Sequence, residues 1–427
     1  MDCHIEVFFN DQWHAAAHVG FSDVVRNGFR GTDCVFQYAI DYAFDHPHEP
    51  VSLTWPVDTE RHQRSEWPAF LYDLVPQGNG RRFLLGQLQL ADSQAADVPL
   101  LCAGAFNSVG RLRIREAVGY FEQHTERHDL AMQGFALDEV LARSPDFHET
   151  MMVHAMLAAG GTGVQGVAPK YLLTEADDGR WYPDGALPDA RARRHYIVKR
   201  PRGNTEADRK VLRNEAGYMA VARRLGLRVA DVPELRGDML FIPRFDRQCV
   251  DGKVRRFHQE STASLAALAG SGTMANQFDL LAAIRRAVDD PPGETREFIQ
   301  RDVLNLAMRN TDNHARNTAV QTIAGETRLT PLFDFAPMYL DPEGITRAAR
   351  WYRPDSGAEL KQWSEILPHL ALPEQEHGAL VDAMMQFGEQ LHGLPAIMRE
   401  AGVDADIIDF LLPSIDTQVT QLRMLAA

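Results

Sequence analysis

The stretch Asn310-Thr311-Asp312-Asn313-His314-Ala315-Arg316-Asn317 decides the fold, and it follows an apolar pattern of helical period over residues 298–308. Asp312 and Asn317 have the DxxxxN spacing in which the aspartate accepts the proton of a substrate hydroxyl and the asparagine binds Mg²⁺. Farther along, Leu332-Phe333-Asp334-Phe335 places a carboxylate in an apolar, strand-like setting, where a charge is costly unless it meets a cation. We therefore expect Asp312 to act as a base, and Asn317 and Asp334 to bind magnesium that bridges the phosphates of ATP. The competing interpretation is a polar loop of Asx turns with one capping aspartate.

A glycine cluster lies upstream, Gly161-Thr162-Gly163-Val164-Gln165-Gly166. It follows a helix-like Met-rich run and precedes a predicted strand over 167–173, which reverses the order found in a dinucleotide-binding fold. Val167 stands where a Walker A loop needs lysine. What fits is a glycine loop over the phosphates of ATP, as in protein kinases, and the alternative is a glycine turn without a ligand.

A lysine and a glutamate extend this pattern. Lys199 ends a predicted strand over 196–199, and Glu215 lies in a predicted helix over 206–225 that Gly226 closes. Kinases use a helix carboxylate to hold the lysine that contacts phosphate. We therefore expect Lys199 to contact phosphate and Glu215 to pair with it.

Composition sets the class of protein. The 427 residues, 45% hydrophobic and 24% charged, predict a globular chain of two or three domains. A net charge of −15 excludes a surface given over to nucleic acid or anionic membrane. Residues 190–213 are the exception, with nine Lys plus Arg against two acids (net +7, leaving −22 on the other 403), and we expect an anion to bind there.

Targeting and cysteine signals indicate a cytoplasmic protein. Four cysteines, at 3, 34, 102 and 249, are too scattered for a disulfide framework or a CxxC metal site. The first residues do not resemble a secretion signal, and no apolar run has the length of a membrane span. We expect no membrane partner.

Three parts follow one another along the chain. Residues 1–125 predict a small α+β module, with strands over 5–9 and 51–55 and a turn signal at 77–80. Residues 126–250 predict a sheet-rich lobe with a strand over 239–243 and a long polar loop over 175–194. Residues 251–427 predict a mainly helical lobe, interrupted by Asp289-Asp290-Pro291-Pro292-Gly293.

Taken in order, these motifs resemble the HipA family, bacterial serine/threonine kinase toxins of type II toxin–antitoxin systems. The matching segments are residues 163–170, 196–199, 214–215, 232–234, 241–247, 258–260, 310–317 and 332–334, with 74–78 and 107–112 in the front module. The resemblance covers nearly the whole chain. It implies an α+β, bilobed protein-kinase-like fold, with a small sheet-rich N-lobe, a mainly helical C-lobe and an extra N-terminal α+β subdomain.

The resemblance also implies the cofactors ATP and Mg²⁺ and the residues at the nucleotide. It gives Asp312 the role of base, Asn317 and Asp334 that of metal ligands, and Lys199 that of phosphate contact. The other residues that it implies at the nucleotide are Gly161, Gly163, Gly166, Lys170, Glu215, Phe241, Ile242, Arg244, Phe245 and His314. Of these, the segment 241–245 would follow the inter-lobe hinge and contact the adenine side.

Family members phosphorylate a protein serine, often in an aminoacyl-tRNA synthetase, which arrests translation and growth. A helix-turn-helix antitoxin similar to HipB neutralises them, and DNA is then bound only through the antitoxin complex. Two alternatives stay open: a catalytically weak kinase-like subunit that holds an antitoxin on operator DNA, and a phosphotransferase acting on a small molecule.

One position departs from the family pattern. The glycine loop of the family commonly starts with a serine whose autophosphorylation switches the kinase off, and Gly163 stands at that position here. Either Thr162 takes over this role, or regulation depends on the partner alone. Ala168 and Pro169 also depart from the common pattern of the loop.

Overall fold

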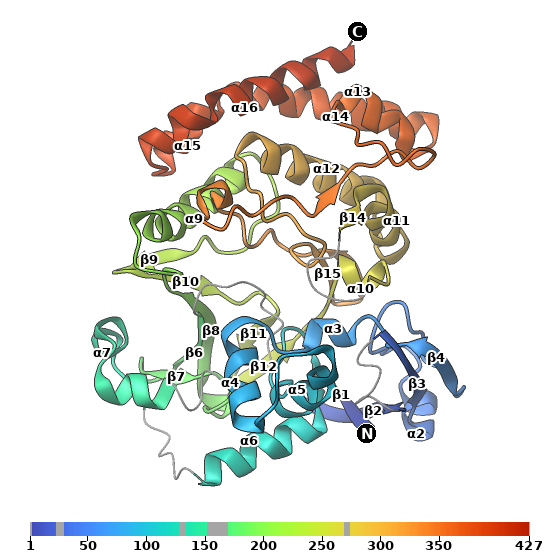
Figure 1. The fold of residues 1–427 in the computed structure, drawn as a ribbon, viewed down its shortest axis with the longest axis vertical. Helices are drawn as coiled ribbons and strands as arrows, with labels where there is room; N and C mark the ends of the chain where they lie inside the picture. Colours follow the sequence, from blue (N-terminus) through green and yellow to red (C-terminus); the bar gives the residue numbers. More distant parts are fainter. Residues whose placement is uncertain (1, 23–29, 128–133, 152–169, 269–273, 427) are drawn as a thin grey trace. The chain divides into compact units, whose positions relative to one another are not determined.

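The computed structural model describes residues 2–22, 30–127, 134–151, 170–268 and 274–426. The chain forms two compact units. Unit 1 contains residues 1–200, 241–260 and 267–269, and unit 2 contains residues 201–240, 261–266 and 270–427. Both helices and strands are abundant, so the predicted α+β class is confirmed (Figure 1).

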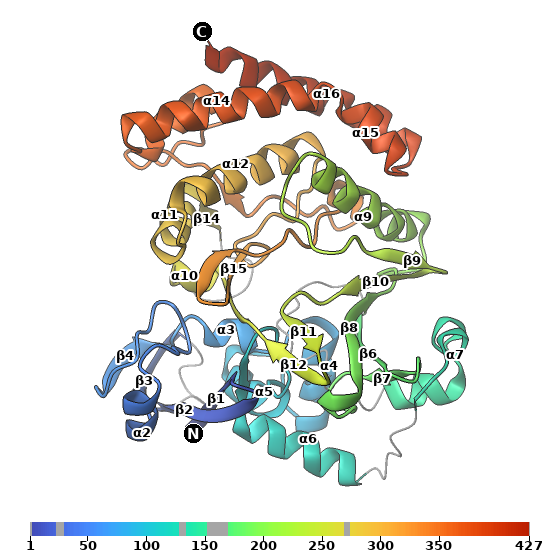
Figure 2. The ribbon, with the colours of Figure 1, turned by 180° about the vertical axis from the view of Figure 1, so that it is seen from behind.

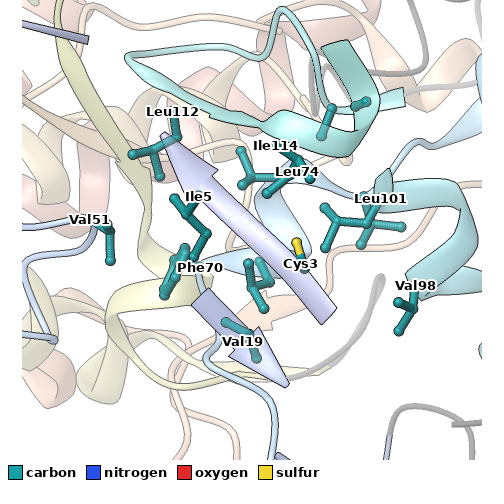
Figure 3. Close-up of a cluster of buried hydrophobic side chains, with 14 of the residues drawn as sticks. Cys3, Ile5, Val19, Val51, Phe70, Leu74, Val98, Leu101, Leu112 and Ile114 are labelled. Carbon is teal, nitrogen blue, oxygen red and sulfur yellow. The ribbon is translucent and has the colours of Figure 1, made fainter. Parts of the chain in front are cut away.

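The front of unit 1 is built on a sheet of order β4-β3-β2-β1-β5. Its strands are β1 (Asp2–Phe9), β2 (Gln12–Phe21), β3 (Arg30–Tyr38), β4 (His62–Glu66) and β5 (Leu112–Ile114). Buried side chains alternate along β1, because successive residues of a strand point to opposite faces. The helices of this part are α2 (Ile40–Asp45), α3 (Leu71–Leu74), α4 (Gly78–Leu88), α5 (Asp97–Gly104) and α6 (Arg115–Arg127). Ile5, Phe70 and Leu101 belong to the apolar core that these elements share (Figure 3).

Two expectations for this module need revision. The strand predicted over 51–55 is wrong: these residues form a turn with an isolated bridge between Ser52 and Trp55. The turn bends around Glu260, whose carboxylate accepts hydrogen bonds from Ser52 Oγ (2.7 Å) and Leu53 N (2.8 Å). The turn signal at 77–80 marks the start of α4, where Gly78 has a φ of 57° that suits glycine.

A second, five-stranded sheet contributes four neighbouring strands to unit 1, in the order β7-β6-β8-β10 (Figure 2). These strands are β6 (Lys170–Ala176), β7 (Trp181–Pro183), β8 (Ala192–Lys199) and β10 (Met239–Pro243), of which β10 begins in unit 2. The predicted strands over 196–199 and 239–243 are confirmed. The predicted loop over 175–194 is wrong in extent, because Trp181 and Tyr182 are buried and pair with β6. Other elements of this unit include α7 (Leu137–Ala142), β11 (Arg247–Val250) and β12 (Lys253–Arg256), and β13 (His258–Ser261) begins in it.

Unit 2 is mainly helical, as predicted. Its longer helices are α9 (Glu206–Arg224), α11 (Gln277–Ala287), α12 (Pro291–Ala307), α14 (Glu374–Leu391), α15 (Leu394–Glu400) and α16 (Ala405–Arg423). Thr205 caps α9 by accepting a hydrogen bond from Asp208 N, and Gly226 follows it with a φ of 84°. Asp290 caps α12, whose first turn contains proline, which explains the predicted helix break. Helix α16 packs along α14 and α12 (Figure 1).

Short strands and short helices connect these longer helices. The strands include β14 (Ala275–Asn276), β15 (Ala319–Ile323), β16 (Glu326–Leu329) and β17 (Ala349–Arg350), and the short helices include α10 (Thr262–Leu265) and α13 (Trp363–Ile366). The strand-like setting predicted for 332–335 is wrong, since these residues form no strand. Among the helices that the described ranges contain, none is both long enough and apolar enough to cross a bilayer.

Candidate functional site

The loop of residues 310–317 lies in unit 2 between α12 and β15. Asn317 Nδ2 donates to the backbone carbonyl of Asp312 at 2.8 Å, and His314 Nε2 lies 3.5 Å from Asp312 Oδ1. The side chain of Asp312 is 25% exposed, so it is only partly buried. The structure thus brings the predicted base, the predicted metal ligand and His314 into one tight loop.

Neighbouring elements hold this loop. Thr262 Oγ1 donates to the carbonyl of Ala315 at 2.5 Å, and Asn313 Nδ2 donates to the buried carboxylate of Asp302 at 2.9 Å. Asp302 is a functional candidate that sequence reasoning missed. The available signal was an acid on the apolar face of α12, one position before Val303.

Asp334 lies beside the same loop in an unusual backbone conformation. Its φ is 50°, in the left-handed region that residues with a side chain seldom occupy. Asn310 Nδ2 donates to the carbonyl of Asp334 at 3.4 Å. The next residue, Phe335, is buried against Tyr218 with ring centroids 5.2 Å apart. Strain of this kind persists where the surroundings fix it and is typical of functional sites.

Helix α9, which carries Glu215, is tied to this part of unit 2. Tyr218 Oη donates to the carbonyl of Met308 at 3.1 Å. On the other side of Glu215, Asn214 Oδ1 accepts from Asp404 N at 2.9 Å and Arg213 pairs with Asp404 at 2.7 Å. Glu215 therefore lies on a helix anchored to the C-terminal helices. Lys199 belongs to unit 1, so its predicted pairing with Glu215 stays a prediction.

The second sheet of unit 1 holds the predicted phosphate lysines. Lys170 and Lys199 are direct partners in the antiparallel pairing of β6 with β8. Side chains at directly opposed positions stand on the same face of a sheet. The side chains of the two lysines therefore project from the same face of the sheet. The predicted glycines Gly161, Gly163 and Gly166, and Thr162 with them, lie outside the described residues.

The predicted adenine segment enters the interior of unit 1. Phe241 is buried, with its ring centroid 5.3 Å from that of Trp181. The guanidinium of Arg244 donates to Asp184 Oδ2 at 2.6 Å and to Asp246 Oδ2 at 2.7 Å, and its side chain has no exposed surface. This environment differs from the nucleotide contact expected of Arg244, because its donors are directed to protein carboxylates. Ile242 and Phe245 are half-buried.

Arg244 belongs to a charge network that joins two sequence motifs. Asp246 Oδ2 accepts from Gly110 N at 3.0 Å, and Arg247 donates to Asn107 Oδ1 at 2.9 Å and to the carbonyl of Ser108 at 2.9 Å. The segments 107–112 and 241–247, far apart in sequence, therefore meet in the core of unit 1. Although burial alone would raise the pKa of Asp246, the guanidinium groups of Arg244 and Arg247 hold it well below its usual range.

The same network contains a histidine. His195 Nδ1 lies 2.8 Å from Asp184 Oδ1 and 3.0 Å from Thr174 Oγ1. Burial lowers the pKa of His195, and the attraction of Asp184 does not offset it. Burial alone would raise the pKa of Asp184, but the hydrogen bond with His195 and the guanidinium groups of Arg244 and Arg247 hold that pKa well below the usual range. His195 is therefore neutral at neutral pH, while Asp184 is ionised.

The basic run 190–213 does not form a free basic surface. Six of its nine arginines and lysines form ion pairs with acids: Arg191 with Asp177 and Asp178, Arg193 with Glu175, Arg202 with Asp341 and Glu343, Arg209 with Glu206, Lys210 with Asp406, and Arg213 with Glu206 and Asp404. These pairs neutralise most of the positive charge. An anion-binding surface along the whole run is therefore not supported, and the proposed phosphate contact of Lys199 stays a prediction.

Two cysteines that are far apart in the sequence, Cys3 and Cys102, meet in unit 1. The ligand atoms of Cys3, Cys102 and Glu116 lie within 4.8 Å of one another. A hydrogen bond with Cys102 and burial raise the pKa of the Cys3 thiol well above its usual value. Metals bind the deprotonated thiolate, which a raised pKa disfavours, and a structural zinc site has four ligands, whereas this group offers three. The three residues are therefore better described as polar groups of the protein core than as a metal site.

The chain is similar to known proteins in both sequence and fold. The sequence profile of the HipA N-terminal domain matches residues 24–115, and that of the HipA-like C-terminal domain matches residues 162–390. The fold is similar to a chain of the Shewanella oneidensis MR-1 complex of HipA, HipB and operator DNA, with a TM-score of 0.64 and 16% identity over 99% of this chain and 96% of that chain. The Helicobacter pylori proinflammatory kinase CtkA gives a TM-score of 0.39 at 15% identity, over 55% of this chain and 88% of that chain. No match was found among curated proteins. Because the C-terminal profile alone spans more than half of the sequence and the N-terminal profile precedes it in the expected order, the chain belongs to the HipA family.

Proposed function

We propose that this protein is an ATP- and Mg²⁺-dependent serine/threonine protein kinase that acts as the toxin of a toxin–antitoxin pair. The observation that carries the proposal is the hydrogen bond from Asn317 Nδ2 to the carbonyl of Asp312. It fixes the proposed base and the proposed metal ligand in one short loop. The second proposed ligand, Asp334, is attached to the same loop through Asn310.

The chemistry of these side chains fits phosphoryl transfer. Asp312 would accept the proton of a hydroxyl group of the substrate protein. The hydroxyl oxygen would then bond to the γ-phosphorus of ATP, while the bond from that phosphorus to the ADP oxygen breaks. Because the amide nitrogen of Asn317 is a donor within the loop, its oxygen is the atom available for a metal. Amide and carboxylate oxygens are the ligands Mg²⁺ prefers, so Asn317 and Asp334 would hold it. When bound, Mg²⁺ neutralises charge on the phosphates.

The phosphates would be received by Lys199 and Lys170. The two residues are directly paired between β6 and β8, so their side chains project from the same face of the sheet and would bind oxygens of the same phosphate chain. Glu215, anchored on α9, would orient Lys199. The glycine loop 161–166 would complete this part of the site.

We further propose that a small helix-turn-helix antitoxin similar to HipB neutralises the kinase and connects it to DNA. The Shewanella relative forms a complex with HipB and operator DNA. The acidic net charge of −15 and the internal pairing of the basic run favour DNA contact through a partner. The substrate would be a protein such as an aminoacyl-tRNA synthetase, in the cytoplasm.

The test is phosphate transfer by the full chain. Wild-type protein and Asp312→Asn are incubated with labelled ATP and Mg²⁺, and brief expression of each is followed by phosphoproteomics. We expect transfer and growth arrest with wild type, and a loss of at least about 100-fold in rate with Asp312→Asn. Asp289→Asn, which alters the acceptor of a Thr327 N–H in the same unit, is the control. Equal rates for wild type and Asp312→Asn would reject the base, and complex formation with an antitoxin without any turnover would favour the binding-subunit alternative.

A further inference from the structure

Asp302 lies at the centre of a buried hydrogen-bond network in unit 2. It projects from α12 and is 2% exposed. Four side chains donate to its carboxylate: Gln277 Nε2 at 3.2 Å, Asn313 Nδ2 at 2.9 Å, Arg347 at 2.5 Å and Trp351 Nε1 at 2.9 Å. A carboxylate withdrawn from water requires such partners, so the four donors and Asp302 depend on one another.

The donors come from three separate segments. Gln277 is the first residue of α11, and Asn313 lies inside the loop between Asp312 and Asn317. Arg347 and Trp351 belong to the chain that follows Asp334. Within the described residues, this carboxylate is therefore a direct link between the proposed catalytic loop and the segment that starts at the proposed metal ligand.

A backbone contact strengthens this link. Ala349, which lies between Arg347 and Trp351, donates its N–H to the carbonyl of Asn313 at 3.0 Å. Asn313 is thus held by its side chain to Asp302 and by its backbone to β17. Because Asn313 immediately follows Asp312, a shift of Asn313 moves the proposed base.

We propose that Asp302 is a positioning residue for phosphoryl transfer, which fixes the position of the loop 312–317 relative to the segment 347–351. The inference rests on the proposed function. Asp302 does not contact the reactants in this proposal. It acts through its hydrogen bonds with Asn313 and Trp351. Loss of one donor loosens the loop and lowers the rate of the chemical step, while the lysines of unit 1 still bind ATP.

The structure supplies a matched pair of substitutions. Trp351 and Trp363 are both buried, their rings lie 6.3 Å apart, and each indole donates to a side-chain oxygen. Trp351 donates to Asp302, whereas Trp363 donates to Gln418 of α16 at 2.8 Å. Trp351→Phe and Trp363→Phe therefore remove the same kind of bond from the same core, and only the first touches Asp302.

The experiment measures kcat, the KM for ATP and the hydrogen exchange of amides 311–317 in the full-length chain. For Trp351→Phe we expect kcat to fall about 10- to 100-fold, the KM for ATP to stay within about twofold, and the loop amides to exchange faster. Trp363→Phe should leave kcat and the loop exchange at wild-type values. Asp302→Asn should lower kcat at least as much as Trp351→Phe, and combining the two should add little, since both act through one carboxylate.

Two results would overturn the positioning role. The first is an equal fall of kcat in both tryptophan variants, which would indicate a general loss of packing. The second is unchanged loop exchange in Trp351→Phe. If wild-type protein transfers no phosphate to any acceptor, the proposed function fails by itself, and the exchange measurement still decides whether Asp302 positions the loop.

Discussion

The side-chain amide of Asn317 donates to the backbone carbonyl of Asp312 at 2.8 Å, across a loop of only four intervening residues. This bond gives one asparagine two separate tasks. Its nitrogen closes the loop that presents Asp312, and its oxygen is the proposed ligand of Mg²⁺. The two tasks can be separated by substitution.

Asn317→Asp should keep an oxygen ligand and lose the loop bond. A carboxylate cannot donate to the carbonyl of Asp312, so we expect the loop to loosen and kcat to fall about 10- to 100-fold while activity still depends on Mg²⁺. Asn317→Ala loses both tasks and should fall further, with a higher Mg²⁺ concentration at half-maximal rate. Initial rates across a Mg²⁺ titration test this. Identical Mg²⁺ curves for Asn317→Ala and wild type would remove Asn317 from the metal site.

Asp334→Gly should change stability and activity in opposite directions. The φ of 50° at Asp334 disfavours a residue with a side chain, and glycine adopts it without that cost. We expect Asp334→Gly to retain or raise the free energy of unfolding by up to about 1 kcal/mol, and to lose phosphate transfer with the carboxylate. Asp334→Asn, which tolerates this conformation, separates charge from backbone. Urea denaturation and transfer assays measure the two effects, and a destabilised glycine variant would show that the carboxylate stabilises the fold.

Local patterns in the sequence predict much of unit 2. The period of α9, the cap and proline of α12 and the spacing of Asp312, Asn317 and Asp334 all depend on residues close in the chain. The structure also places Asp312 and Asn317 in contact. Their roles in transfer stay predictions.

The parts that sequence reasoning missed depend on residues far apart in the chain. Asp302 resembles any other helix acid until Trp351, 49 positions later, donates to it. Arg244 follows a strand and was expected at the nucleotide, but its partner Asp184 lies 60 positions upstream. The turn at 51–55 has strand composition, and Glu260, over 200 positions away, decides its shape. Pairings of this kind are fixed by tertiary structure, which local propensity does not contain.

The buried network of unit 1 should make Arg244 critical for stability. Arg244→Met removes the cation and leaves Asp184 and Asp246 with fewer partners in a site closed to water. Breaking a buried pair in this way costs about 3–5 kcal/mol. Arg191→Met, which breaks an exposed arrangement with Asp177 and Asp178, should leave the urea midpoint unchanged. Similar midpoints for the two variants would show that the network contributes little.

Stability of unit 1 should fall as the pH is lowered from about 7 to about 5. Burial lowers the pKa of His195 despite Asp184, and it lowers the pKa of His258 despite Glu260. Below an unfolded-state pKa of about 6.5, the unfolded chain therefore binds protons that the folded chain excludes, which favours unfolding by up to about 1.4 kcal/mol per pH unit for each histidine. His195→Gln should reduce this slope, and His369→Gln, which replaces a half-buried histidine of unit 2, serves as the control. Urea denaturation across this pH range, with hydrogen exchange of the β8 amides as a local measure, provides the slopes. A slope in His195→Gln as steep as in wild type would mean that His195 takes up its proton in the folded protein, and the neutral state assigned to it beside Asp184 would then be wrong.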